Sequence, residues 1–172
     1  MGFMNIIIKK IDDFTNWVGK IASWSVILLM LLVVFEVVMR RVFSSPTIWT
    51  FESITMVFGF HFMFVAGYAL LHKSLVSVDI LYERFSKKTK AVLDLVTYVI
   101  FFFPFVISLL YLGYQFAADS WVTKEISSSL WGPPLYPFKT IIPIAMSILA
   151  LQGISEVFKR ILILVTEDKE YD

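Results

Sequence analysis

Hydrophobic residues fall into four long runs, separated by short segments that hold most of the polar residues. The approximate bounds of the runs are 21–39, 51–71, 91–114 and 140–165. A helix needs about 20 apolar residues to cross about 30 Å of hydrocarbon, so each run is long enough to span a bilayer. Because a helix satisfies its own backbone hydrogen bonds, the pattern predicts an all-α membrane protein with four transmembrane helices. We expect these helices to form a single domain over residues 1–172.

Lysine and arginine are unevenly distributed between the two sides of the predicted membrane. Eleven of the fifteen lie in the N-terminal, middle and C-terminal segments, which share one side. The other side holds Arg40, Arg41, Lys124 and Lys139. Since positive residues accumulate in cytoplasmic segments, both termini are expected in the cytoplasm.

The middle segment has a helical stripe of its own. Its apolar positions follow the i, i+3, i+4, i+7 spacing and are Val78, Leu81, Tyr82 and Phe85. Lys87 and Lys88 come directly after the stripe. The pattern predicts a short amphipathic helix over about 77–88 in the membrane interface, and a solvated helical hairpin is the alternative.

The segment 118–139 contains three prolines and a glycine between the last two runs, which excludes a continuous helix. Trp121 and Trp131 suit the aromatic belt of a membrane interface. We expect this segment to lie against the membrane surface or a partner. In the middle of the third run, Pro104 is expected to kink the helix near Ile100.

Charged residues at the ends of the first two runs form a candidate cluster. Glu36 and Arg40 are one helical turn apart and can pair. Glu52 opens the second run and is expected to reach Arg40 or Arg41 across the short loop. The cluster is interpreted either as a structural clamp or as a contact with a partner.

Polar and small residues within the runs are the remaining candidates, because polar groups in lipid are costly. His61 is interpreted as a ligand, a proton carrier or, more simply, a hydrogen-bonding partner of a neighbouring helix. Gly59 and Gly67 permit close approach of helices. The fourth run carries a polar stripe that is expected to pack against another helix or the interfacial segment: Gln152, Ser155, Glu156, Lys159 and Arg160. Within it, Glu156 and Arg160 are one helical turn apart and are expected to pair.

The composition agrees with a membrane protein and narrows the function. Mean hydropathy is +0.78, and the chain has 17 phenylalanines and no cysteine. The sequence contains no P-loop, GxSxG, HExxH or glycine-rich dinucleotide-binding motif. We therefore expect no catalytic residues, no cofactor, no metal site and no nucleic-acid partner. The halves of the chain lack the self-similarity of many transporters, which favours a subunit over a self-sufficient transporter.

Three separated motifs point to a family. They are "EVVMRRVFSSPTIW" at 36–49, followed by Glu52, then "HKSLVSVDI" at 72–80 and "LYPFKTIIPIAMSILALQG" at 135–153. Together with the four runs, they resemble the small membrane subunit of TRAP transporters, the DctQ type. On that resemblance, the outer motif includes Glu36, Arg40, Arg41, Trp49 and Glu52.

The resemblance implies an importer of an organic acid, of the sialic acid or C4-dicarboxylate type, driven by a Na⁺ gradient in a bacterial inner membrane. The small subunit would form a heterodimer with a large, elevator-type membrane subunit and act as its scaffold. A periplasmic substrate-binding protein would deliver the cargo. Two alternatives stay open: a membrane anchor of a respiratory complex with His61 as haem ligand, and a small self-associating exporter.

Overall fold

The structure, a computed structural model, describes residues 2–74 and 85–168. Within these residues, two helices precede the middle segment: α1 (Gly2–Arg41) and α2 (Thr50–Leu71). The third helical segment consists of α4 (Lys87–Thr97), the π-helix η1 (Tyr98–Phe102) and α5 (Phe103–Thr123). The fourth consists of a short turn, α6 (Tyr136–Lys139), and α7 (Ile141–Asp168). As predicted, four helical segments are long and apolar enough to cross a membrane.

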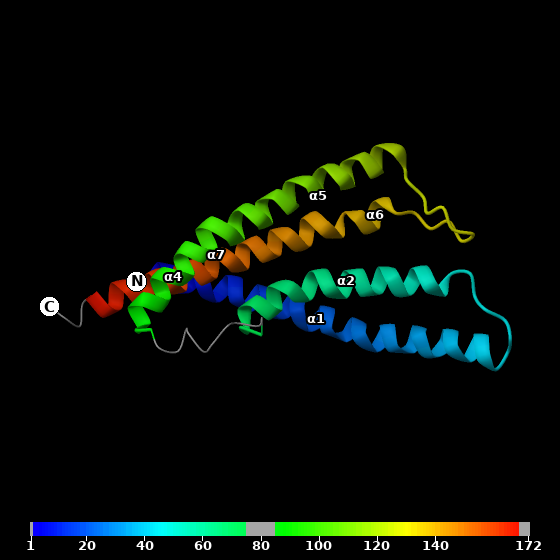
Figure 1. Cartoon of the computed structure of the whole chain (residues 1–172), viewed down its shortest axis with the longest axis horizontal. Helices are drawn as coiled ribbons and strands as arrows, with labels where there is room; N and C mark the ends of the chain where they lie inside the picture. The colour runs from blue at the N-terminus through cyan, green and yellow to red at the C-terminus, as the bar shows by residue number, and fades with distance from the viewer. Residues whose placement is uncertain (1, 75–84, 169–172) are drawn as a thin grey trace.

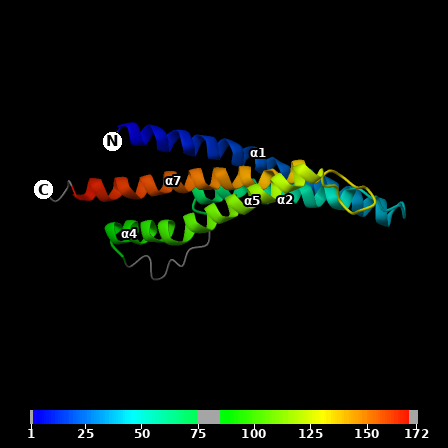
Figure 2. The same cartoon turned by 90° about the horizontal axis from the view of Figure 1, so that it is seen from above.

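The helices lie side by side in an elongated, twisted layer. The beginning of α1 and the end of α7 lie at one end, which we call the terminal end (Figure 1). The α1–α2 and α5–α6 connections lie at the opposite end, the loop end (Figure 1). In Figure 1 the α1–α2 pair and the α5–α7 pair diverge toward the loop end. Figure 2, turned by 90°, shows α1, α7 and α4 spread apart at the terminal end instead.

Helix α7 is the centre of this layer. It contacts α1, α2, α4 and α5, whereas the largest contacts of α1 are with α2. The most apolar stretch of α7 is 39% buried within the protein, against 6–11% in the other three segments. Most apolar side chains of α1 and α5 are therefore left facing outward, as expected where lipid replaces water as the solvent.

Close helix contacts depend on glycine. A Cβ on Gly19 of α1 would lie 2.4 Å from Tyr68 Cβ of α2, and one on Gly153 of α7 would lie 2.3 Å from the Phe102 ring. Small residues allow such approach, which matters in lipid because apolar burial adds little drive there.

The wide turn η1 lies directly before Pro104, where the sequence predicts a kink. Proline has no N–H, so the Ile100 carbonyl lacks its usual donor four residues on. One residue earlier, the Phe103 N–H bonds the carbonyl of Tyr98, five residues back, rather than the carbonyl four residues back that an α-helix would use. π-Bulges of this kind are one of the recognised causes of irregularity in long helices.

Two helices are longer than the hydrophobic runs predict. α1 begins at Gly2 rather than near residue 21, and its 40 residues give a length of about 60 Å. The third segment extends from Lys87 to Thr123 instead of 91–114. Hydropathy marks the lipid-facing part of a helix, but the helix itself continues until a backbone signal ends it. Lys124 provides that signal for α5 with a left-handed backbone, at φ 48°.

The predicted interfacial helix over 77–88 is wrong at its C-terminal end. Lys87 and Lys88 belong to the first turn of α4, because Ser86 has an extended backbone and its Oγ accepts from Thr89 N at 3.2 Å. Residues 77–84 of the prediction, with Val78, Leu81 and Tyr82, lie outside the described residues, and Phe85 is exposed.

The α1–α2 contact can be tested with Gly19→Ala. The added methyl meets Tyr68 at its Cβ, which cannot move without the backbone of α2. Because overpacking costs about 1–3 kcal/mol, we expect a lower unfolding temperature in detergent. Gly2→Ala is the control, since nothing lies within 4 Å of its position. An unchanged unfolding temperature in Gly19→Ala would contradict the packing described.

Candidate functional site

Asp12 of α1 is held by three side chains of α7. Its Oδ1 accepts hydrogen bonds from Gln152 Nε2 at 3.0 Å and from Ser155 Oγ at 2.7 Å. Its Oδ2 lies 2.9 Å from Lys159 Nζ. Gln152 and Ser155 are fully buried. This contact joins the first and last helices of the chain near the terminal end.

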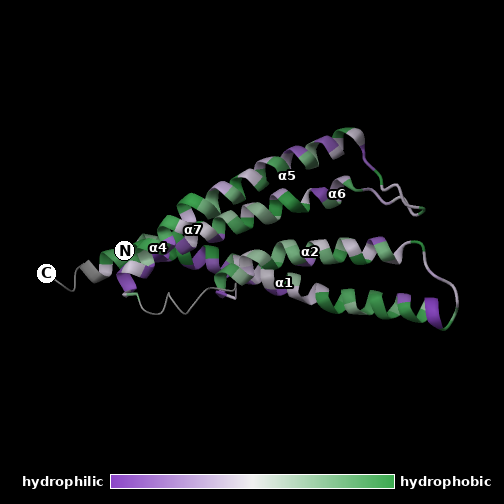
Figure 3. Ribbon diagram, in the orientation of Figure 1, coloured by the Kyte–Doolittle hydropathy of each residue, from purple (hydrophilic) through white to green (hydrophobic). Residues whose placement is uncertain are grey.

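The same group of charges continues to α4. Lys159 Nζ also lies 2.6 Å from Glu156 Oε1, and Arg160 Nη2 lies 3.7 Å from Glu156 Oε2. Arg160 Nε in turn lies 2.7 Å from Asp94 Oδ2 of α4. We call this set the terminal network: Asp12, Asp94, Gln152, Ser155, Glu156, Lys159 and Arg160. Figure 3 shows polar positions gathered where α1, α4 and α7 meet.

The terminal network neutralises a buried carboxylate. Glu156 is only 2% exposed, and an unpaired charge at such a position is strongly unfavourable. Two cations shared among three carboxylates offset that penalty and connect three helices to each other. Arrangements of this kind are strongly destabilised when one partner is removed. The predicted pair of Glu156 and Arg160 is confirmed.

His61 links α2 to α1 midway along the layer. Its Nδ1 lies 3.0 Å from the Ala22 carbonyl oxygen and 3.1 Å from Ser25 Oγ. Ser25 Oγ also donates to the Ala22 carbonyl at 2.5 Å. The structure thus contains the hydrogen bond to a neighbouring helix that the simplest interpretation of His61 expects.

Glu36 is the centre of a polar cluster at the loop end. Arg40 Nη2 donates to its Oε1 at 2.7 Å, and Thr47 Oγ1 donates to its Oε2 at 2.6 Å. Thr47 also bonds Thr50, which is fully buried at the start of α2. We call Glu36, Arg40, Thr47 and Thr50 the loop-end cluster. Glu36 thus holds the α1–α2 connection as well as its predicted partner Arg40.

The expected pairing of Glu52 with Arg40 or Arg41 is wrong. Glu52 Oε1 instead accepts a hydrogen bond from Ser127 Oγ in the α5–α6 connection. Among the described residues, no carboxylate lies within ion-pairing distance of Arg41. Glu52 therefore ties the first turn of α2 to a segment 75 residues later in the chain.

The α5–α6 connection is an ordered hairpin, residues 124–135. Ser127 N donates to the Pro133 carbonyl, and Leu135 N donates to the Glu125 carbonyl, both at 2.9 Å. Beyond it, Lys139 Nζ lies 2.5 Å from Glu125 Oε2 and 3.7 Å from the centre of the Phe116 ring. The hydrogen bond from Lys139 holds the pKa of the Glu125 carboxyl below its usual range.

The other predicted residues occupy helix contacts or the loop end. The Trp49 ring lies 5.8 Å from that of Phe35. Trp121 Nε1 donates to Thr140 Oγ1 at 2.8 Å, and Trp131 lies in the hairpin. A Cβ on Gly59 would lie 2.8 Å from the Phe138 ring, and one on Gly67 would touch Thr15 and Ile148. The expected close approach is found at Gly59, whereas a Cβ at Gly67 would make ordinary van der Waals contacts.

Asp12 and Asp94 are the members of the terminal network that the sequence analysis missed. Asp12 lies outside the hydrophobic run of α1, but it shares a helix face with three buried residues at spacings of three and four: Thr15, Gly19 and Ala22. This stripe of small and polar residues is the sequence signal from which a contact between Asp12 and another helix could have been predicted.

The four helical segments are long and apolar enough to cross a membrane, and the polar side chains described above join them to one another. The family model of the DctQ component of tripartite ATP-independent periplasmic transporters matches residues 29–162. The chain belongs to this family and is therefore a small permease subunit of a TRAP transporter, a multi-pass membrane protein. A search of curated proteins found no match.

The link between Asp12 and Lys159 predicts energetic coupling. Their side chains remain 24% and 27% exposed, so we expect Lys159→Met to cost about 1–3 kcal/mol of unfolding free energy. In a double-mutant cycle with Asp12→Asn, the double variant should lose less than the sum of the single losses. Lys10→Met, at an exposed position of α1, is the control. Strict additivity would show that the two residues do not interact.

The loop-end cluster predicts unequal effects of its two charged residues. The Arg40 side chain is 61% exposed, and exposed ion pairs contribute about 0–1 kcal/mol. Glu36→Ala should lower the unfolding temperature more than Arg40→Ala, because it also releases Thr47. Glu36→Gln, which keeps an acceptor for Thr47, should fall between them. Equal losses in Glu36→Ala and Arg40→Ala would argue against the Thr47 contact.

Proposed function

We propose that this chain is the scaffold subunit of a Na⁺-driven importer of an organic acid. It would form a heterodimer with the large membrane subunit, which moves as an elevator and carries the Na⁺ and substrate sites. A periplasmic substrate-binding protein would deliver the cargo, of the sialic acid or C4-dicarboxylate type. On this proposal the four helices act as one domain in a bacterial inner membrane, and both termini are cytoplasmic.

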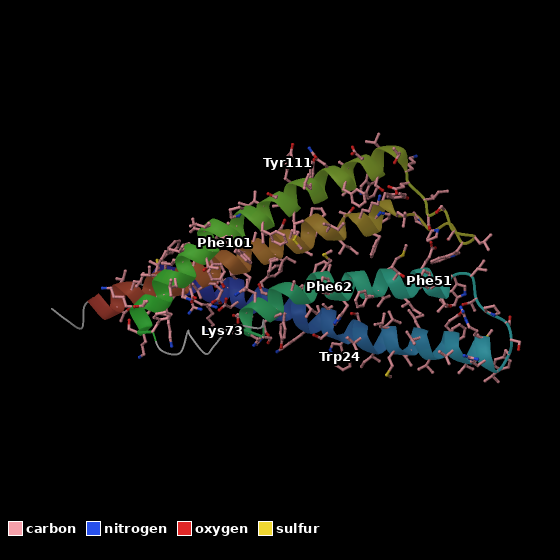
Figure 4. The ribbon with its side chains drawn as sticks, in the orientation of Figure 1. Trp24, Phe51, Phe62, Lys73, Phe101 and Tyr111 are labelled. Carbon is pink, nitrogen blue, oxygen red and sulfur yellow. The ribbon has the colours of Figure 1, made fainter. Side chains whose placement is uncertain are left out.

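The observation that carries the proposal is the terminal network within a one-layer arrangement of helices. A scaffold has to keep its shape while its partner moves, and ion pairs across α1, α4 and α7 oppose sliding of these helices. A layer also leaves a large lateral surface for a partner. Trp24 on α1 and Tyr111 on α5 point outward at opposite edges of the layer (Figure 4).

The alternatives receive no support from the family. The DctQ component belongs to a transporter, which leaves a haem-binding anchor of a respiratory complex without support. The role of His61 is proposed to be the α1–α2 hydrogen bond rather than haem ligation.

Site-specific crosslinking tests the scaffold role. Benzoylphenylalanine at Trp24, Tyr111 or Phe62 replaces an exposed aromatic residue on α1, α5 or α2 with a photoreactive aromatic one. With the large subunit coexpressed, we expect a crosslink to it from at least one position. The same variant expressed without the large subunit is the control.

Transport measurements complete the test. Vesicles that contain both membrane subunits should take up the organic acid down a Na⁺ gradient when the binding protein is added. Vesicles with this chain alone should not. Uptake by the chain alone, or no crosslink from any of the three positions, would contradict the proposal.

A further inference from the structure

The α5–α6 hairpin exposes apolar side chains at its tip. Leu130 is 90% exposed, Ile126 is 65% exposed and Trp131 is 42% exposed. Residues 126–138 carry no charge, so the tip offers nothing for an ionic partner. An ordered, uncharged turn that presents leucine and tryptophan is costly in water and suited to an apolar surrounding.

The hairpin is not a loose loop, because its own hydrogen bonds fix the tip. Ser129 Oγ accepts from Trp131 N and Gly132 N, both at 3.2 Å. Gly132 supplies the left-handed backbone that the turn requires, at φ 61°. The exposure of Leu130 and Trp131 is therefore a property of the folded hairpin.

The position of the hairpin along the layer is fixed by Glu52. The Ser127–Glu52 hydrogen bond holds the hairpin at the level of the first turn of α2, a turn in which Phe51 is 75% exposed. In Figure 1 the α1–α2 connection extends farther along the long axis than the hairpin does. The hairpin thus extends past the ends of α2 and α5 but not as far as the α1–α2 connection, which places it where the spanning helices end (Figure 1).

From these observations we propose that the hairpin tip inserts into the membrane interface as a lipid anchor, with Leu130 and Trp131 as its contacts. The anchor rests on the assignment of α2 as a membrane-spanning helix, whose ends lie at the interface. Tryptophan favours this depth because its ring is apolar and its N–H remains able to meet headgroups or water. A soluble protein partner is less suited to this tip, since transient protein interfaces have polar and charged rims.

The absence of cysteine from the sequence allows a clean depth measurement. A nitroxide attached to Leu130→Cys is examined in phospholipid nanodiscs by its accessibility to oxygen and to a water-soluble nickel chelate. Phe105→Cys, on an exposed apolar position of α5, is the lipid reference. Ser45→Cys, in the α1–α2 connection, is the water reference. We expect residue 130 to shift toward the lipid reference, with higher oxygen and lower nickel accessibility than residue 45.

Two outcomes overturn the anchor. In the first, residue 130 has the nickel accessibility of residue 45 in nanodiscs. In the second, residue 130 is accessible to nickel in the chain alone and protected from both reagents only when the other transporter subunits are added, which assigns the tip to a protein contact. The nanodisc measurement needs no partner subunit, so its failure is distinguishable from failure of the proposed scaffold function.

Discussion

The burial of Glu156 in α7 is the constraint on which the arrangement of the helices depends. Neither lipid nor the apolar neighbours of α7 can stabilise a carboxylate, so its counter-charges must come from the protein. Lys159 and Arg160 provide them from the next turn of the same helix. Each cation is then shared with a second carboxylate, Asp12 of α1 or Asp94 of α4. Neutralising one buried side chain thereby fixes the register of three helices.

Between the terminal network and the loop end, the layer is held by shape and by neutral hydrogen bonds. Gly19 and Gly153 receive the side chains of Tyr68 and Phe102, and His61 bonds the backbone of α1. None of these contacts requires a charged side chain in the interior of the layer. Apolar residues can therefore face outward along both edges, which would be a liability in water and is the normal condition in lipid.

The sequence predicted best what local chemistry determines. The bounds of α2 were predicted within one residue, because Glu52 marks its beginning and His72 its end. The pair of Glu36 and Arg40 followed from helical spacing alone. The contacts that were not predicted join distant parts of the chain. Asp12 meets Gln152 across 140 residues, and Glu52 meets the α5–α6 hairpin, which no sequence pattern places near α2. The start of α1 was missed because hydropathy identifies only the part of a helix that lies in lipid, and α1 begins before that part.

The two ends of the layer are stabilised differently, and this difference bears on a scaffold function. At the terminal end, ion pairs connect separate helices. At the loop end, among the described residues, the ion pairs Glu36–Arg40 and Glu125–Lys139 each stay within one pair of helices. The diverging pairs are joined there by the Ser127–Glu52 hydrogen bond and by Phe138 packed on Gly59. Without ionic links between the pairs, their spacing at the loop end depends on these two contacts, and one of them is made by the hairpin itself.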